Sequence, residues 1–265
     1  MSRGLGDVYK RQQLLFLLNN VAKMKKTTEL GSRIAEVHNG SSLFTGDAGQ
    51  GESNARRYMI ENDLVEAIIA LPENMFYNTG IGTFIWILSN NKAEHRKGKI
   101  QLIDATSLKS PLRKNLGKKN CEFTSEIRRQ ILDLYMAFEE NEYSKIFDNN
   151  EFGYWKVTVL RPAYNEDGTI QRDKKGKPFV NKELTDTEQI PFTYEGGIEA
   201  FFEKEVKPFA PDAWIDEKQT KIGYEISFTK YFYKPIQLRT LEEITADIRS
   251  LEEETDGLLA EIIGG

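Results

Sequence analysis

The chain has 265 residues and a net charge of −5, so it can bury a sizeable core but offers little basic surface for gripping DNA alone. A single cysteine, Cys121, excludes an internal disulfide framework, and two histidines far apart, His38 and His95, leave no metal-ligand spacing. The longest apolar run, residues 81–88, is too short to span a bilayer, and without a secretory signal we expect a cytoplasmic protein.

The amino-terminal part predicts a helix that follows an irregular segment. Residues 1–12 show neither helical nor strand periodicity, and we expect this segment to be non-native. From Gln13 to Lys26 apolar residues recur at helical spacing. They are Leu14, Leu17, Leu18, Val21 and Met24. Because this helix begins abruptly, we expect the natural chain to start upstream.

Residues 31–44 predict a short strand that breaks at Asn39-Gly40, and a loop over residues 45–53 follows it. The loop contains Gly49-Gln50-Gly51, but it lacks the further glycine or the Gly-Lys-Ser/Thr ending of a phosphate-binding loop. A mobile surface loop is therefore favoured over a phosphate site.

A helix is expected after this loop, ending near Asn62. Ser53 is a candidate for its N-terminal cap, because a serine hydroxyl can accept a hydrogen bond from a free backbone N–H. Arg56 and Arg57 are expected on the solvent-facing surface of this helix.

Three apolar segments in a row predict strands of one sheet. Residues 64–71 and 81–88 are continuous apolar runs separated by an irregular turn, and residues 99–105 follow after a charged turn. Strands separated by helices in this rhythm predict an α/β domain with a mixed sheet.

The turn between the first two of these strands is the most informative part of the chain. It carries Phe76, Tyr77, Asn78 and Thr79, which combine flat aromatic faces with polar donors and acceptors. A flipped nucleobase requires such a pocket. The alternative is that Phe76 and Tyr77 only close the end of the sheet, while residues 78–80 make an ordinary turn.

The second half of the chain mixes helical and strand patterns. Residues 111–143 predict a helical segment, with Ile127, Ile131, Leu134 and Phe138 on one face. Residues 154–160 predict a strand that leads into a polar excursion, and residues 195–214 predict a further helix. Five aromatics within residues 223–235 are more typical of a core than of a nucleic-acid stacking platform.

The carboxyl-terminal segment predicts a long helix with a heptad seam. The seam consists of Leu241, Ile244, Ile248, Leu251, Thr255, Leu258 and Ile262. Such a stripe requires a cover, which can be the same domain or another chain. Polar Thr255 and the neighbouring Gly257 weaken the helix, so we expect it to order on binding.

Local basic clusters stand out against the acidic composition. They are Lys23, Lys25 and Lys26; Lys109, Arg113, Lys114, Lys118 and Lys119; and Arg172, Lys174, Lys175 and Lys177. Each is more typical of a solvated face or loop than of a phosphate track. If DNA is the substrate, a partner or another segment must supply much of the basic surface.

Four blocks, at residues 64–81, 98–106, 152–162 and 212–235, resemble the modification (methyltransferase) subunit of type I restriction-modification systems. The resemblance implies the carboxyl-terminal part of a class I S-adenosylmethionine-dependent methyltransferase sheet, followed by a mostly helical region with a long terminal helix. It also implies methyl transfer from S-adenosylmethionine to the N6 amine of adenine in double-stranded DNA. The implied partners are a specificity subunit and a restriction subunit.

The resemblance carries over to particular residues. Phe76, Tyr77, Asn78 and Thr79 match a Phe-Tyr-Asn-Thr turn that shapes the target-base pocket, whereas residues 38–40 replace the usual proline with His38. The terminal helix is expected to pack against the specificity subunit. The expected contact residues are Leu241, Ile244, Ile248, Leu251, Leu258 and Ile262.

The implied chemistry is incomplete in these residues. The family orients the adenine amine with an Asn/Asp-Pro-Pro-Phe/Tyr motif, but all eight prolines here stand singly. The glycine-rich cofactor loop is also missing, and both motifs are expected upstream of Gln13. We therefore expect this chain alone to lack activity and to contain no cofactor site. A hydrolase based on His38 with Ser41 or Ser42 is disfavoured, because no elbow motif surrounds these residues.

The expected organisation is the carboxyl-terminal part of a catalytic domain over residues 13–110, a helical segment over 111–150, a strand with a polar excursion over 151–200, and a helical tail over 201–265. One alternative is a non-catalytic assembly module that binds the specificity subunit. Another is an unrelated α/β interaction protein, if the four matching blocks are coincidental.

Overall fold

The computed structural model describes residues 5–233 and 240–263. The chain divides into two compact units, Met1–Phe232 and Tyr233–Gly265, and each is described by itself. The first unit contains a five-stranded sheet with the strand order β1-β3-β2-β4-β7. The strands are β1 (Arg33–Asn39), β2 (Val65–Leu71), β3 (Thr83–Ser89), β4 (Lys99–Asp104) and β7 (Ser144–Asp148).

The five-stranded sheet is mixed, as the sequence predicts. Strand β2 runs parallel to β4, whereas β3 is antiparallel to both β1 and β2, and β7 is antiparallel to β4. Strands β1, β2 and β4 therefore run in one direction, and their carboxyl ends meet at the same edge of the sheet. The three predicted strands at 64–71, 81–88 and 99–105 are confirmed within one or two residues at each end.

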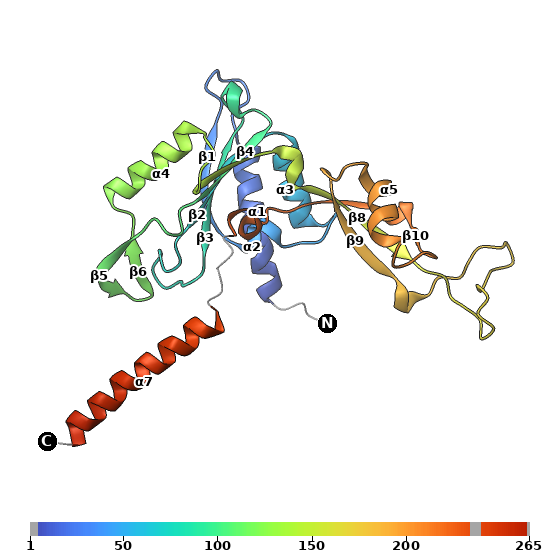
Figure 1. The fold of residues 1–265 in the computed structure, drawn as a ribbon. Coiled ribbons are helices and arrows are strands. Elements are labelled where there is room, and N and C mark those ends of the chain that lie inside the picture. Colours follow the sequence, from blue (N-terminus) through green and yellow to red (C-terminus); the bar gives the residue numbers. More distant parts are fainter. Residues whose placement is uncertain (1–4, 234–239, 264–265) are drawn as a thin grey trace. The chain divides into compact units, whose positions relative to one another are not determined.

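Helices cover both faces of this sheet (Figure 1). On one face, α1 (Leu5–Ala22), α2 (Ser41–Phe44) and α3 (Gly51–Glu61) pack over a core that includes Ile68 and Trp86. On the other face, α4 (Ser125–Ala137) packs over Ile69 and Ile103. The neighbours Ile68 and Ile69 lie in different cores because side chains of a strand alternate between faces. Helix α1 begins at Leu5, so it includes most of the segment set aside as irregular.

Residues 110–122 form a hairpin, not the start of a helix. Its strands are β5 (Ser110–Leu116) and β6 (Lys119–Glu122), and Gly117 turns between them with a φ of +62°. This stretch has polar and charged residues without helical apolar spacing, so it offers a helix no face to bury. The predicted helix is confirmed only for α4, whose N-cap Thr124 accepts a hydrogen bond from the Ile127 N–H.

A second sheet is centred on β8 (Gly153–Leu160), which confirms the strand predicted over residues 154–160. Strand β8 pairs with three strands from later in the chain. They are β9 (Asp186–Pro191), β10 (Trp214–Ile215) and β11 (Lys221–Tyr224). The predicted helix over 195–214 is shorter than expected and consists of α5 (Gly197–Phe201) and a π-helical turn, η4 (Phe202–Val206).

The expected helical tail is therefore interrupted, because β10 and β11 lie within it. The remaining elements are short and connect the larger ones. They are η1 (Glu94–Arg96), η2 (Asn149–Phe152), η3 (Lys182–Leu184), η5 (Glu217–Gln219) and α6 (Phe228–Phe232).

Arg56 joins α3 to distant parts of the chain. Its guanidinium is fully buried, and it donates hydrogen bonds of 2.7, 3.0 and 2.8 Å to the carbonyl oxygens of Tyr224, Ser42 and Thr45. Burial lowers the pKa of Arg56 to about 10, so the group stays charged at neutral pH. The expectation that Arg56 lies on the surface is wrong, because three backbone carbonyls replace its hydration.

Ser53 is not the helix cap. Gln50 occupies the N-cap position of α3, and Ser53 lies inside the helix, fully buried. Its hydroxyl accepts a 2.9 Å hydrogen bond from the Tyr224 N–H. Arg56 and Ser53 together fasten the end of β11 to α3.

The second unit contains α7 (Leu241–Ile263). Thr240 and Glu243 form a capping box, in which each side chain accepts a hydrogen bond from the other residue's backbone N–H. The described seam residues are solvent-exposed, with values of 83, 43, 53 and 61% for Leu241, Ile244, Ile248 and Leu251. The side chains of Leu258 and Ile262 lie outside the described part of the chain.

None of the described helices is long and apolar enough to cross a membrane.

Candidate functional site

The carboxyl ends of three parallel strands bring separate segments of the chain to one edge of the sheet. Asn39 at the end of β1 and Leu71 at the end of β2 both pair with Thr83 of β3. Asp104 at the end of β4 pairs with Ala70. In open α/β sheets this edge is where ligands bind, so we call it the carboxyl edge.

The predicted site residues lie in the turn that leaves this edge between β2 and β3. Phe76 and Tyr77 are 38 and 65% exposed, which leaves both residues accessible to a ligand. Asn78 adopts a left-handed backbone with a φ of +59°, a conformation that asparagine tolerates better than most residues. Thr79 Oγ1 accepts a 3.5 Å hydrogen bond from the Ile81 N–H. All four residues are thus brought together in one exposed turn.

The β5–β6 hairpin supports this turn. Asn120 donates a 3.1 Å backbone hydrogen bond to the Asn74 carbonyl, and Lys119 Nζ donates a 3.0 Å bond to the Met75 carbonyl. The hairpin approaches the turn closely at Gly117, because a Cβ there would lie 3.1 Å from Asn78 Oδ1 and would be tightly packed against it. The sequence pattern does not predict this support, because residues 111–143 were expected to be helical.

The end of β1 forms a closed polar turn. His38 is buried, with Nε2 3.2 Å from Glu36 Oε1. Burial lowers the pKa of His38, although Glu36 opposes this effect, so the imidazole is neutral at neutral pH. The Asn39 side-chain oxygen accepts hydrogen bonds from the backbone N–H and the hydroxyl of Ser41, which preserves a tight turn without the proline.

The serines beside His38 are not arranged as nucleophiles. The Ser42 hydroxyl donates a 2.9 Å hydrogen bond to the Asn39 carbonyl and accepts a 3.1 Å bond from Trp86 Nε1. Among the described residues, His38 makes no hydrogen bond with either Ser41 or Ser42. This arrangement stabilises the strand end and does not support hydrolase chemistry.

Asp104 is a further polar residue at the carboxyl edge that sequence analysis did not single out. Its Oδ1 accepts hydrogen bonds of 3.0 and 2.6 Å from the Thr106 N–H and hydroxyl. The sequence signal is the Asp-Ala-Thr that follows the apolar strand directly. Only the register with β2 shows that Asp104 lies at the same edge as the aromatic turn.

The described residues do not fit a cofactor cradle. The only glycine-rich loop before a described helix of useful length is the one at residues 45–51, and it is used internally. The Gly49 N–H donates a 3.0 Å hydrogen bond to the Ile222 carbonyl, and a Cβ at Gly49 would lie 3.5 Å from the Lys221 side chain. The described part of the chain also has no cluster of three residues suited to a metal ion.

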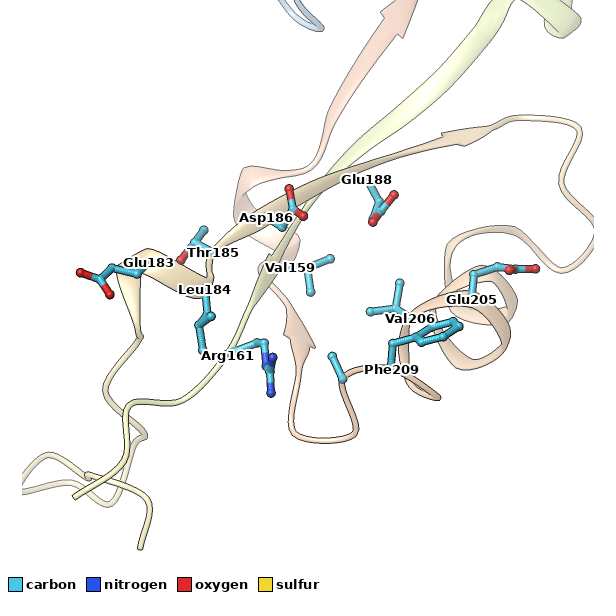
Figure 2. Close-up of a pocket in the computed structure, with 11 residues that line it drawn as sticks. Val159, Arg161, Glu183, Leu184, Thr185, Asp186, Glu188, Glu205, Val206 and Phe209 are labelled. Atoms are coloured by element: carbon cyan, nitrogen blue, oxygen red, sulfur yellow. The ribbon is translucent and has the colours of Figure 1, made fainter. Parts of the chain in front are cut away.

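A cavity of about 600 Å³ lies in the second sheet, away from the carboxyl edge. Figure 2 shows Asp186, Glu188 and Glu205 around an apolar lining that includes Val159 and Phe209. Burial, together with the Asp186 charge, raises the pKa of Glu188. These carboxylates would repel a phosphate backbone, so the cavity is a poor candidate for a nucleic-acid site.

Comparisons with known proteins identify relatives of this chain. The chain is 34% identical over 114 residues to the type I restriction enzyme MjaIX methylase subunit of Methanocaldococcus jannaschii, a match that covers 43% of this chain and 19% of that subunit. It is 29% identical over 164 residues to the HindI methylase subunit of Haemophilus influenzae, covering 58 and 35% of the two chains. The chain thus spans between a fifth and about a third of these relatives.

One solved structure is also similar to part of this chain. The type I restriction-modification methyltransferase subunit from Streptococcus thermophilus is 26% identical, with a TM-score of 0.43 over 52% of this chain and 26% of that one. Residues 9–157 match the family model described as N-6 DNA Methylase, and the match begins inside the segment that was expected to be non-native. More than half of the chain is matched, and the predicted resemblance is confirmed: the chain belongs to the N-6 DNA methylase family.

Proposed function

We propose that this chain supplies one wall of the target-adenine pocket in a type I DNA adenine-N6 methyltransferase that uses S-adenosylmethionine as methyl donor. The observation that carries the proposal is the position of the turn at residues 76–79. It leaves the carboxyl edge beside Asn39 and Asp104, within the region that matches the methylase family.

The chemistry explains why an exposed aromatic turn is useful there. The lone pair of the adenine N6 amine is delocalised into the ring, so the base must be held outside the duplex in a fixed orientation. Phe76 or Tyr77 can stack on the flipped base, while Asn78 and Thr79 offer polar groups to its edge. The Asn-Pro-Pro-aromatic motif is absent from these 265 residues, so the proposal assigns the orientation of the amine to another segment.

The proposal is tested in a complete methyltransferase that contains this chain, by measuring methyl transfer to duplex DNA. Phe76→Ala removes a stacking face, and Asn78→Gly removes the amide while it keeps the left-handed backbone unstrained. Phe76→Ala should reduce methyl transfer by about 10-fold, since stacking on an aromatic ring contributes about 1–3 kcal/mol per base. Asn78→Gly should reduce it by about 5-fold, since a hydrogen bond contributes about 1 kcal/mol.

Phe209→Ala is the matched control, because Phe209 is 85% exposed and lines the cavity in the second sheet, away from the carboxyl edge. It should leave methyl transfer unchanged. Undiminished transfer in both turn variants would mean that the turn only closes the sheet.

We further propose that the seam of α7 docks on the specificity subunit. The observations that favour it are the exposed apolar residues along a helix that has its own capping box. Ile248→Asp with Leu251→Asp should abolish copurification with that subunit. Ala246→Asp with Ser250→Asp adds the same charge at positions away from the seam and should preserve copurification. Equal loss in both pairs would contradict docking through the seam.

A further inference from the structure

The β5–β6 hairpin carries a group of cations that the fold leaves without partners. Arg113, Lys114 and Lys118 are exposed, and within the described residues none of them forms an ion pair or a side-chain hydrogen bond. Some other surface cations do have a neighbouring acid, such as Arg129, whose Nε lies 3.1 Å from Asp133 Oδ1. Lys174 and Lys175 in the polar excursion resemble the hairpin cations in forming no ion pair with a described residue, so the position of the hairpin is what distinguishes it. In a chain with a net charge of −5, a local cluster of unpaired cations indicates an anionic partner.

The hairpin is held in place relative to the aromatic turn. Lys119 and Asn120 of β6 bond to the carbonyl oxygens of Met75 and Asn74, and the Cys121 thiol lies 3.4 Å from the Glu73 carbonyl oxygen. The ribbon that carries the three cations is therefore anchored to residues 73–75, which directly precede Phe76 and Tyr77. A flexible surface loop would not provide such a position.

The shape of the hairpin suits a duplex. A two-stranded ribbon fits the DNA major groove, which is about 12 Å wide. Figure 1 shows the hairpin projecting beyond the five-stranded sheet. The tip is narrow because Gly117 makes the turn, and Leu116 pairs with Lys119 directly beside it. The only acid of β6, Glu122, pairs with Ser110 at the opposite end, so it does not offset the charge of the tip.

We infer that the β5–β6 hairpin is a DNA-backbone contact, in which Arg113, Lys114 and Lys118 bind the phosphates that flank the target adenine. The inference rests on the proposed function. The contacts are independent of sequence, and they hold the duplex so that a flipped base reaches the turn at residues 76–79. This contact also supplies, next to the turn at residues 76–79, part of the basic surface that the overall composition lacks.

The test measures binding of this chain to a fluorescently labelled duplex oligonucleotide by anisotropy over a range of salt concentrations. The test variant combines Arg113→Gln, Lys114→Gln and Lys118→Gln. The matched control combines Arg172→Gln, Lys174→Gln and Lys175→Gln, which removes the same charge from the exposed polar excursion.

The hairpin variant should lower the slope of log affinity against log salt by about 2 to 3, because each phosphate contact contributes about 0.9. The control should keep the slope of the unmodified chain. A third variant with Arg113→Lys, Lys114→Arg and Lys118→Arg should have the same slope as the unmodified chain. This result separates the effect of charge from any effect on folding.

Equal slopes in the hairpin variant and the unmodified chain would overturn the inference, and so would equal losses in the hairpin and control variants. Absence of duplex binding by the unmodified chain at low salt would overturn it as well. In each of these cases the proposed function stands if Phe76→Ala or Asn78→Gly still reduces methyl transfer in the complete enzyme, and falls if neither does.

Discussion

Lys119 Nζ donates a 3.0 Å hydrogen bond to the carbonyl oxygen of Met75, which ties a basic hairpin to the turn that carries the exposed aromatic pair. The two segments are separated by strands β3 and β4 in the sequence. Their connection means that the position of Phe76 and Tyr77 depends on residues that do not touch the proposed base pocket.

Lys119→Met tests this dependence, because methionine keeps an unbranched stem but cannot donate the hydrogen bond. Backbone amides in residues 73–80 should exchange with solvent about 5-fold faster, as expected for loss of a bond that contributes about 1 kcal/mol. Lys118→Met is the control, since its side chain makes no hydrogen bond to the described residues, and it should leave exchange unchanged. Unchanged exchange in both variants would show that the turn is stable without the hydrogen bond from Lys119.

Gly117→Ala tests the close approach of hairpin and turn. Both Gly117 and the control Gly98 have a positive φ, so alanine strains the backbone by about 1 kcal/mol at either position. A Cβ at Gly117 would also press on Asn78 Oδ1, whereas a Cβ at Gly98 would meet open space. The nuclear magnetic resonance signals of the Asn78 side-chain amide should shift in Gly117→Ala only. A similar shift in Gly98→Ala would contradict the proposed contact.

Arg56→Lys is expected to destabilise the fold strongly although it conserves charge. A lysine ammonium cannot reach the Ser42, Thr45 and Tyr224 carbonyls together, so buried acceptors are left unsatisfied. The free energy of unfolding should fall by about 3 kcal/mol in a urea titration. Arg57→Lys is the neighbouring control; it keeps an exposed pair with Glu61 and should change stability by less than about 0.5 kcal/mol.

Asp63 is expected to make stability depend on pH. Burial alone would raise the pKa of Asp63, but hydrogen bonds from Lys92, Gly98 and Asn149 outweigh it and hold the pKa below its ordinary value. The carboxylate therefore stabilises the folded state above its unfolded pKa of about 4, and this stabilisation is lost as pH falls through the lowered folded value.

Asp63→Asn isolates this effect, since asparagine also tolerates the φ of +54° at this position. Near pH 7 the variant should unfold at a free energy about 2 kcal/mol lower, because the buried Lys92 ammonium loses its partner 2.5 Å away. As pH falls through the lowered pKa of folded Asp63, the two proteins should converge, since the wild-type carboxyl then also becomes neutral. A difference that persists unchanged in acid would point to packing as its cause.

The sequence was sufficient to predict the strands that are buried on both faces. Residues 64–71 and 99–105 are apolar runs with clear boundaries, so their place in a mixed sheet could be predicted from pattern alone. The aromatic turn could also be located, because it lies between two such strands. Its place at the same sheet edge as Asp104 depended on strand register, which local sequence does not encode.

The wrong predictions for Arg56, Ser53 and the hairpin have a common physical cause. Arg56 and Ser53 are buried through acceptors and donors at Tyr224, far along the chain, so helical position alone could not reveal their burial. The hairpin was missed because its strands are short and polar and carry no alternating apolar pattern. In both cases contacts with residues far along the chain decided the structure, and local propensity did not.

The most direct test of the base-pocket assignment is photo-crosslinking in a complete methyltransferase that contains this chain. A duplex oligonucleotide carrying 5-iodouracil in place of the target adenine is irradiated, and the crosslinked peptides are mapped by mass spectrometry. If residues 76–79 form the pocket wall, the crosslinks fall on Phe76 or Tyr77 and disappear in the variant that replaces both with leucine. Crosslinks confined to other segments, with none in this turn, would contradict its role in holding the base.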